Sequence, residues 1–320
     1  MQVKAADPTA AESRTRPEHR VPPLRTAAPR WRSRKVQGLA YAAPTAVFVT
    51  VFFLLPLLLV GQMSLSDWPL LAGDRGINAP ENYTDATDTT LFWPAVRFTL
   101  LYTVIVTVVL LGLALLLALL VQESRPAAGF FRTVYFLPSA LGLASASLLF
   151  WGLYSPSTGP LSRILENLGL VDDPVSFLGT PTSALLSTVF LIVWKFAGFY
   201  MLILLVGLQR IPHEVFEAAR MDGASRGQIF RSITLPLLRP SLALTLLLCV
   251  TGSLLAFDQF FVLTKGGPDN STVTVVQLIY REAFQRMNLG TAAALSVIVL
   301  GVLLLLNALQ FRGLRRADES

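Results

Sequence analysis

The chain has 320 residues, of which 53% are hydrophobic and only 14% charged, and its formal net charge is +6. Soluble domains carry about 25% charged residues, so this composition excludes an ordinary soluble domain and indicates a membrane protein. A single cysteine, Cys249, excludes an internal disulfide. Two histidines without a Cys/His cluster predict neither a structural nor a catalytic metal site, and we expect no cofactor.

The N-terminal stretch, residues 1–37, is basic and rich in Pro, Ala and Arg. Such a segment could suggest nucleic-acid binding. Its composition is more typical of a disordered tail that stays in the cytoplasm. We therefore expect a disordered basic cytoplasmic tail here and no nucleic-acid partner.

Six apolar segments follow, at residues 39–63, 98–121, 133–154, 183–208, 240–264 and 289–311. About 20 residues suffice to cross the hydrocarbon core of a bilayer. A segment in lipid must satisfy its own backbone hydrogen bonds, so each should be a helix. The sequence predicts an all-α membrane protein with six transmembrane helices in one domain, residues 38–316, followed by a cytoplasmic tail at 317–320.

The orientation follows from the positive charges in the connections. The two termini and the connections 122–132 and 209–239 together hold 19 of the 26 Lys and Arg residues, and the other connections hold six. Cytoplasmic loops carry the excess of Lys and Arg. We expect both termini in the cytoplasm.

The most informative segment is a polar insert between the fourth and fifth apolar segments, the loop 209–239. It reads Glu217-Ala218-Ala219, three residues, Gly223, nine residues, then Ile233-Thr234-Leu235-Pro236. A helical pattern covers residues 213–221, with acidic residues near its start, where the helix dipole favours them. A glycine can adopt the positive φ that ends a helix. The insert predicts a short helix along the cytoplasmic membrane surface.

The spacing EAA-x3-G-x9-I-x-LP matches the cytoplasmic loop of membrane subunits of binding-protein-dependent ABC importers. Further matching segments lie at residues 130–133, 136–138, 193–195, 207–212 and 262–268. Together they resemble the sugar-type branch, the maltose- and glycerol-phosphate-like permeases. The resemblance covers about residues 39–316. It implies the type I ABC importer permease fold and a location in the inner, or plasma, membrane of a bacterial-type cell.

The resemblance also implies that the insert is a coupling helix that docks on an ABC ATPase subunit. The coupling residues would be Glu217, Ala218, Ala219, Asp222, Gly223, Ile233, Leu235 and Pro236. The alternative is an amphipathic helix on lipid headgroups, which four arginines in the insert could support. Lipid-lying helices carry little acid on the polar face, so the acidic residues Glu214, Glu217 and Asp222 favour docking.

The other implied partners are a second, related permease in a heterodimeric pore, an extracytoplasmic solute-binding protein, membrane lipids and a sugar-like solute. No GxxxxGK[ST], GxSxG or HExxH motif occurs, so the chain by itself is not expected to be an enzyme and has no catalytic residues. Two other classes of membrane protein have less support in the sequence. An ion-coupled carrier or channel would need a relay of intramembrane carboxylates or an internal repeat, and a membrane-bound enzyme would need a catalytic constellation. Within the family, a phosphate, metal-oxyanion or peptide permease stays open.

Two charges lie inside the apolar segments, Lys195 in the fourth and Asp258 in the fifth. A lone ammonium at that depth costs around 3 kcal/mol, so Lys195 should face the bundle interior. Asp258 is expected in the outer half of the membrane, on one helix with Pro240. Two interpretations stay open. In the first, the role is structural: Lys195 and Asp258 form an ion pair, or Asp258 reaches the outer water. In the second, Lys195, Phe199, Asp258 and Gln259 line the solute path.

Overall fold

The computed structural model describes residues 34–122 and 126–318. Contacts divide the chain into two compact units, Met1–Leu55 and Pro56–Ser320. The boundary falls inside the first expected span. Most of the expected N-terminal tail lies outside the described residues, as do residues 319–320 of the expected C-terminal tail.

The first unit contains α1 (Arg34–Val49) and η1 (Thr50–Leu54), and α2 (Leu55–Met63) follows directly. Residues Gly38–Met63 are long and apolar enough to cross a membrane, and none of their most apolar stretch is buried. The η1 segment is π-helical and ends two residues before Pro56. A wider turn at this place relieves the clash between a proline ring and the carbonyl one turn earlier.

The core of the second unit is built on three long helices. α4 (Phe92–Val121) packs along α8 (Pro181–Gln209), and α11 (Leu235–Leu254) packs on both. Alanines of α4 and the large side chains of Tyr102, Met201 and Leu204 are buried where these helices meet. α13 (Leu289–Asp318) packs against α11 and against the short helices near its own start.

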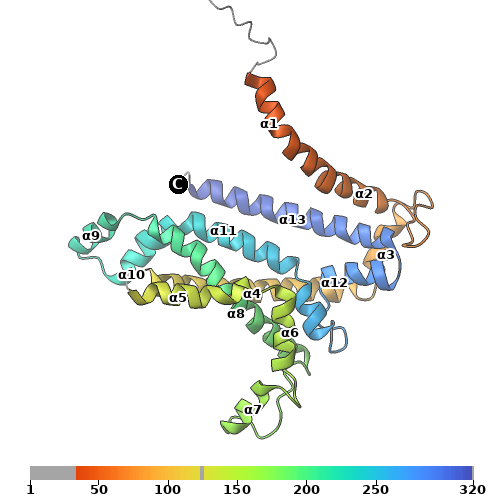
Figure 1. Ribbon diagram of the computed structural model, residues 1–320. Helices are drawn as coiled ribbons and strands as arrows, with labels where there is room; N and C mark the ends of the chain where they lie inside the picture. The colour runs from red at the N-terminus through yellow and green to blue at the C-terminus, as the bar shows by residue number, and fades with distance from the viewer. Residues whose placement is uncertain (1–33, 123–125, 319–320) are drawn as a thin grey trace, which may run out of the picture. The chain divides into compact units, whose positions relative to one another are not determined.

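Shorter elements connect and flank this core. They are α3 (Glu81–Asp88), α5 (Pro126–Phe136), η2 (Leu137–Ala140), α6 (Leu143–Leu153), α7 (Pro160–Asn167), α9 (His213–Met221), α10 (Arg226–Ile229), η3 (Phe230–Thr234), η4 (Phe260–Thr264), α12 (Val275–Tyr280) and η5 (Arg281–Gln285). Figure 1 shows α9 and α10 at one end of the second unit, with α3 and α12 at the other. The last turn of α13 lies at the α9 end.

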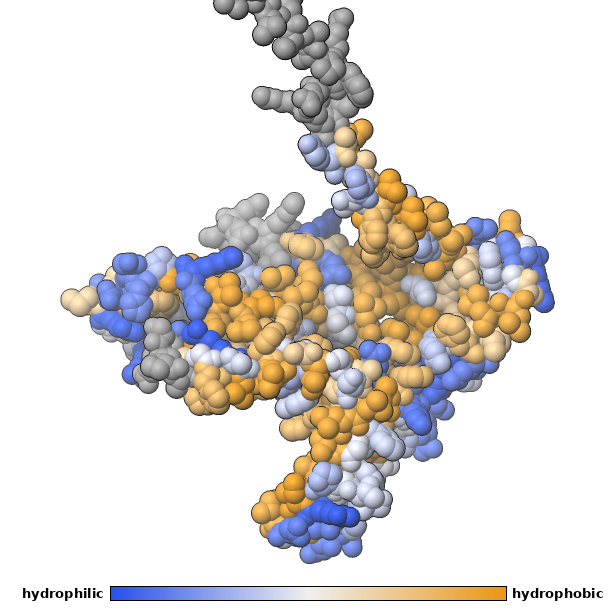
Figure 2. Space-filling model, in the orientation of Figure 1, coloured by the Kyte–Doolittle hydropathy of each residue, from blue (hydrophilic) through white to orange (hydrophobic). Residues whose placement is uncertain are grey.

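The surface of the second unit follows this arrangement. In Figure 2, hydrophilic residues gather at the α9–α10 end and at the α3 end, and apolar residues cover the stretch between them. Among the described residues, five helices are long and apolar enough to cross a membrane, or six if the bent pair Ala128–Ala140 and Leu143–Leu153 forms one span. Long apolar helices between two polar ends are what a multi-pass membrane protein requires.

The third expected span differs from the prediction of one helix over 133–154. The chain breaks at Leu141 and Gly142, and the helical segments on either side are bent by 94°. Leu141 has an extended backbone, with ψ 146°. Pro138 weakens the helix before the break because it has no N–H to donate.

The fifth expected span also differs. Its helix covers Arg226–Leu254 rather than 240–264, and Pro240 lies inside it. The π-helical η3 ends just before Pro236 and accommodates that proline without a break. Beyond Leu254 the backbone is not helical until Asp258. The expectation that Asp258 shares a helix with Pro240 is therefore wrong.

Candidate functional site

The loop helix α9 is built as the sequence pattern predicts, over His213–Met221. It ends because Gly223 adopts a left-handed conformation with φ +77°. The N–H of Gly223 donates to the carbonyl of Arg220 (3.1 Å), and the N–H of Ala224 donates to that of Ala219 (3.0 Å). These two bonds satisfy the last carbonyls of the helix and turn the chain sharply back toward α10.

The eight predicted coupling residues fall into two groups. Glu217, Ala218, Asp222 and Gly223 are exposed, and Ala219 is half-buried. Ile233, Leu235 and Pro236 are half-buried in the helix that leads to α11. The first group can therefore contact another protein, whereas the second joins the loop to the membrane helices. Phe216 packs on the core and fixes α9 to the same body.

Sequence reasoning did not single out Met221 as a contact residue. Its side chain, at the last position of α9, is 87% exposed. An apolar side chain this exposed, next to the exposed part of the motif, can anchor a partner surface. The sequence contains a signal for this role: Met221 is an apolar residue directly before the polar Asp222-Gly223 turn, where no buried position is expected.

A cavity of about 210 Å³ lies between the three core helices. Its lining residues come from α4, α6, α8, α11 and the segment that follows α11: Tyr102, Val106, Leu110, Leu143, Ile192, Phe196, Tyr200, Cys249, Gly252, Ser253, Leu255, Ala256, Phe257, Asp258 and Gln259. The break after Leu254 lies in its wall, and the break at Leu141 ends at Leu143, which also lines it. Non-helical backbone at membrane depth is tolerated where it is buried in protein or lines a water-filled cavity.

Lys195 supports the first break. Its Nζ donates to the carbonyl of Ser139 (3.2 Å) and to that of Leu141, and the residue is only 3% exposed. The ammonium also lies 4.9 Å from the centre of the Phe196 ring. Carbonyls freed by a broken helix need donors in an apolar layer, and the lysine supplies them from α8. The close packing of α8 on α5 allows this, because an added methyl at Gly198 would overlap the carbonyl oxygen of Tyr135.

A hydroxyl supports the second break. The Oγ1 of Thr274, just before α12, donates to the carbonyl of Ala256 at 2.8 Å. Both residues are buried. Each break beside the cavity thus has a side chain from another element that satisfies a freed carbonyl. Such support fixes the non-helical backbone around the cavity.

The structure separates the four residues predicted for the solute path. Asp258 and Gln259 line the cavity, and Lys195 and Phe199 do not. Lys195 bonds the carbonyls of the first break rather than Asp258. Phe199 is 38% exposed and stacks edge-on against Tyr200 at 5.4 Å.

The sequence analysis did not predict the aromatic part of the cavity wall. Tyr102, Phe196, Tyr200 and Phe257 contribute rings, and Gln259 Nε2 donates to the Tyr102 hydroxyl (3.1 Å). A spacing of four residues, at Ile192, Phe196 and Tyr200, puts three of the lining residues on one face of α8. That spacing was visible in the sequence, but it is also typical of ordinary helix packing.

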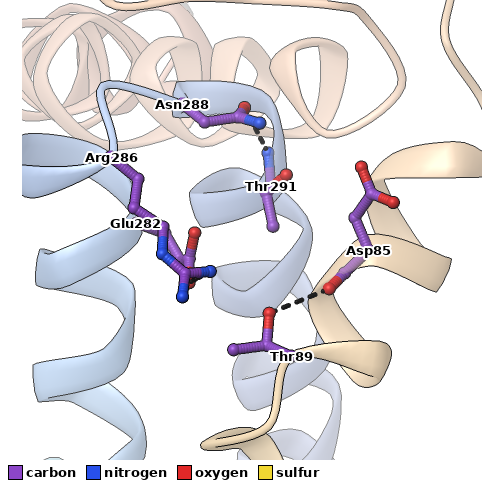
Figure 3. Close-up of polar contacts among 6 residues, drawn as sticks. All are labelled: Asp85, Thr89, Glu282, Arg286, Asn288 and Thr291. Carbon is purple, nitrogen blue, oxygen red and sulfur yellow. Dashed lines mark hydrogen bonds and ion pairs between the residues drawn. The ribbon is translucent and has the colours of Figure 1, made fainter.

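A polar hollow of about 380 Å³ lies at the other end of the second unit, lined by Asp85, Asp88, Thr89, Glu282, Arg286, Asn288 and Thr291. Figure 3 shows six of these residues, which converge from α3, η5 and the start of α13. Arg286 Nη1 pairs with Glu282 Oε1 at 2.9 Å, and Thr291 N–H donates to Asn288 Oδ1 at 3.1 Å.

Glu282 is the buried acid of this hollow, at 3% exposure. Burial raises the pKa of its carboxyl above the ordinary value, while Arg286 partly offsets that shift. The charge of Asp85 adds a smaller increase of the same pKa. In the part of the chain that the structure describes, no group of three His, Cys, Asp or Glu side chains could hold a metal ion. Three acidic residues and one basic residue line the hollow.

Comparison with known proteins identifies the family. Residues 110–316 match the model of the family described as "Binding-protein-dependent transport system inner membrane component". The chain is 31% identical over 325 residues to the diacetylchitobiose uptake system permease protein NgcF of Streptomyces coelicolor, covering 97% of this chain and 91% of that protein. It is 32% identical over 285 residues to the sn-glycerol-3-phosphate transport system permease protein UgpA of Agrobacterium fabrum, covering 87% and 94%.

The fold is that of a known importer subunit. A chain of the bacterial alginate ABC transporter, solved in complex with an alginate pentasaccharide-bound periplasmic protein, superposes with a TM-score of 0.78. The superposition covers 88% of this chain and 95% of that one, at 24% identity. The chain therefore belongs to the inner membrane components of binding-protein-dependent transport systems, and it is the non-catalytic permease subunit of an ABC importer.

Proposed function

We propose that this permease carries a sugar or sugar-like solute across the inner membrane, driven by ATPase subunits that dock on α9. The observation that carries the proposal is the position of α9. It is an exposed helix with Glu217 and Ala218 on its surface, held at the shared end of α8 and α11. Force applied to α9 reaches both long helices, because Phe216 packs on the core and α10 continues into α11.

The remaining parts of the proposal follow from the two ends of the second unit. The end with α9 and the last turn of α13 is cytoplasmic, which agrees with the excess of Lys and Arg in those segments. The opposite end, with the acidic hollow, then faces outside, where a solute-binding protein docks.

A second, related permease forms the other half of the pore, and the cavity between the helix breaks belongs to the solute path. The bent pair α5–η2 and α6 counts as one span, which gives six.

The docking of the ATPase can be tested with a matched pair of charge reversals on α9. Glu217 belongs to the loop motif, whereas Glu214 is an exposed glutamate in the first turn of the same helix. We expect Glu217→Lys to reduce the ATPase retained by the purified permease at least about tenfold, as loss of a central interface contact does. Glu214→Lys should retain most of it.

Transport is measured in parallel as ATP-dependent solute uptake by proteoliposomes that contain the whole importer. The importer with Glu217→Lys should lose uptake in proportion to the ATPase subunit that it fails to retain. Uptake that continues without ATP and disappears when the proton gradient is collapsed would instead indicate an ion-coupled carrier and overturn the proposal.

A further inference from the structure

The cavity between the helix breaks has an acidic wall. Among the described residues that line it, Asp258 is the only charged one, and this residue is exposed. Lys195 of α8 does not line the cavity. Its residue is buried, and its ammonium donates to the carbonyls of Ser139 and Leu141. The described lining residues therefore give the cavity one negative charge and no positive charge.

The uncharged part of the wall suits a polyhydroxylated ring. Aromatic side chains can stack on the C–H faces of a sugar, and four aromatic residues line the cavity. Gln259 adds a polar atom: its Nε2 bonds Tyr102, and its Oε1 has no partner although the residue is 98% buried. A buried polar atom without a partner is costly unless a ligand satisfies it, and a sugar hydroxyl has the required chemistry.

The names of the relatives leave the charge of the solute open. They include a diacetylchitobiose system and an sn-glycerol-3-phosphate system. The charge of Asp258 would repel a phosphate ester, whereas it would not repel a neutral disaccharide. Like charges repel strongly in a confined site with low-dielectric walls, whereas opposite charges are concentrated there.

We propose that this cavity admits neutral sugars and amino sugars and rejects sugars that carry a phosphate, sulfonate or carboxylate group. Asp258 is the specificity-determining residue, and Gln259 with the aromatic rings holds the hydroxylated ring. This inference rests on the proposed function, since it assigns a substrate class to the same solute path.

Cys249, which lines the cavity and is the only cysteine of the chain, provides a built-in reporter. Its thiolate attacks the sulfur of a methanethiosulfonate, forms a mixed disulfide and releases methanesulfinate. The test uses the complete importer and compares a cationic reagent, 2-(trimethylammonium)ethyl methanethiosulfonate, with an anionic one, 2-sulfonatoethyl methanethiosulfonate. Rates are read by mass spectrometry of the Cys249 peptide and divided by the rates with free mercaptoethanol.

We expect the cationic reagent to react at least about tenfold faster after this normalisation, as expected for a focused negative potential. Asp258→Asn should bring the ratio close to one. Asp74→Asn, which removes an exposed acid that does not line the cavity, should leave it unchanged. Equal normalised rates in the unmodified importer would overturn the inference, as would failure of both reagents to reach Cys249 in every nucleotide state.

Protection by solutes addresses the substrate class itself. N,N′-diacetylchitobiose or chitobiose should slow labelling of Cys249, and sn-glycerol 3-phosphate should not. Protection by sn-glycerol 3-phosphate alone would contradict the inference. These outcomes are independent of ATPase retention by α9, so the selectivity can fail while the assignment as an ATP-driven permease stands.

Discussion

Lys195 shows how the role of a residue depends on what surrounds it. From the sequence, an ammonium in the fourth apolar segment is a candidate for the solute path. In the folded chain, the ammonium satisfies carbonyls that the break at Leu141 leaves without helical partners. The contacts favour a structural role for Lys195. Asp258, an exposed acidic residue that lines the cavity, is the better candidate for contact with solute.

A substitution at Lys195 tests this interpretation. Lys195→Leu would remove the charged donor of the carbonyls of Ser139 and Leu141, and hydrogen bonds to charged groups typically contribute about 1.5–3 kcal/mol of stability. We expect a lower thermal unfolding midpoint of the purified permease and less assembled importer. Asp258→Asn, used as the comparison, should keep both near normal. An unchanged midpoint for Lys195→Leu with lost uptake would return the lysine to the solute path.

Glu282 predicts a dependence of local stability on pH. Its folded pKa is raised by burial above the ordinary value of 4.5, with Arg286 as a partial offset. Between these two pKa values the folded state holds a proton that the unfolded state has lost. The free energy of unfolding therefore falls as pH rises through this window, and it levels off above the raised pKa.

The measurement is hydrogen exchange of α12 and η5 across acidic to neutral pH, corrected for the intrinsic exchange rates. Protection should decrease as pH rises through the window in the unmodified protein. Glu282→Gln should abolish this trend because the side chain no longer titrates. The same trend in the variant would show that another group is responsible.

At the scale of elements, the coupling loop is defined by how α9 ends. Gly223 has φ +77°, whereas Gly227 lies in the helical α10. An added methyl meets no atom within 4 Å at either position. The two glycines therefore differ in backbone conformation alone, which makes them a matched pair.

Gly223→Ala forces a left-handed conformation on a residue with a Cβ, which costs roughly 1–2 kcal/mol. We expect the turn after α9 to be disturbed and both ATPase retention and ATP-dependent uptake to fall several-fold. Gly227→Ala should leave both unchanged or slightly improved, because alanine favours a helix. Equal effects of the two substitutions would indicate that the turn geometry does not matter for docking.

At the scale of the whole chain, the proposed orientation is open to a direct topology experiment. In a Cys249→Ser background, a cysteine replaces either Asp222, in the turn after α9, or Asp74, before α3. Both positions are exposed. In intact cells, a membrane-impermeant maleimide should label Asp74→Cys and not Asp222→Cys. After permeabilisation, both should react. Labelling of Asp222→Cys from outside would show that the topology is the reverse of the proposed one and that the loop cannot contact a cytoplasmic ATPase.

The sequence determined the elements whose causes are local. Apolar composition and length predicted the long helices, because a crossing segment must satisfy its own backbone. The pattern Glu217-Ala218-Ala219 with Gly223 located α9 and its end, since a left-handed glycine stops a helix by its own φ. The acidic Asp258 and the polar Gln259 next to it stand out in an apolar segment of the sequence, and both line the cavity.

The tertiary structure alone decided where helices break in the middle of apolar segments. The bend at Leu141 and the end of α11 at Leu254 depend on donors supplied from elsewhere, Lys195 in α8 and Thr274 before α12. No local pattern reports that a distant side chain will satisfy a freed carbonyl. For the same reason only the fold could show that residues next to both breaks line one cavity, with Asp258 among them and Lys195 outside the lining.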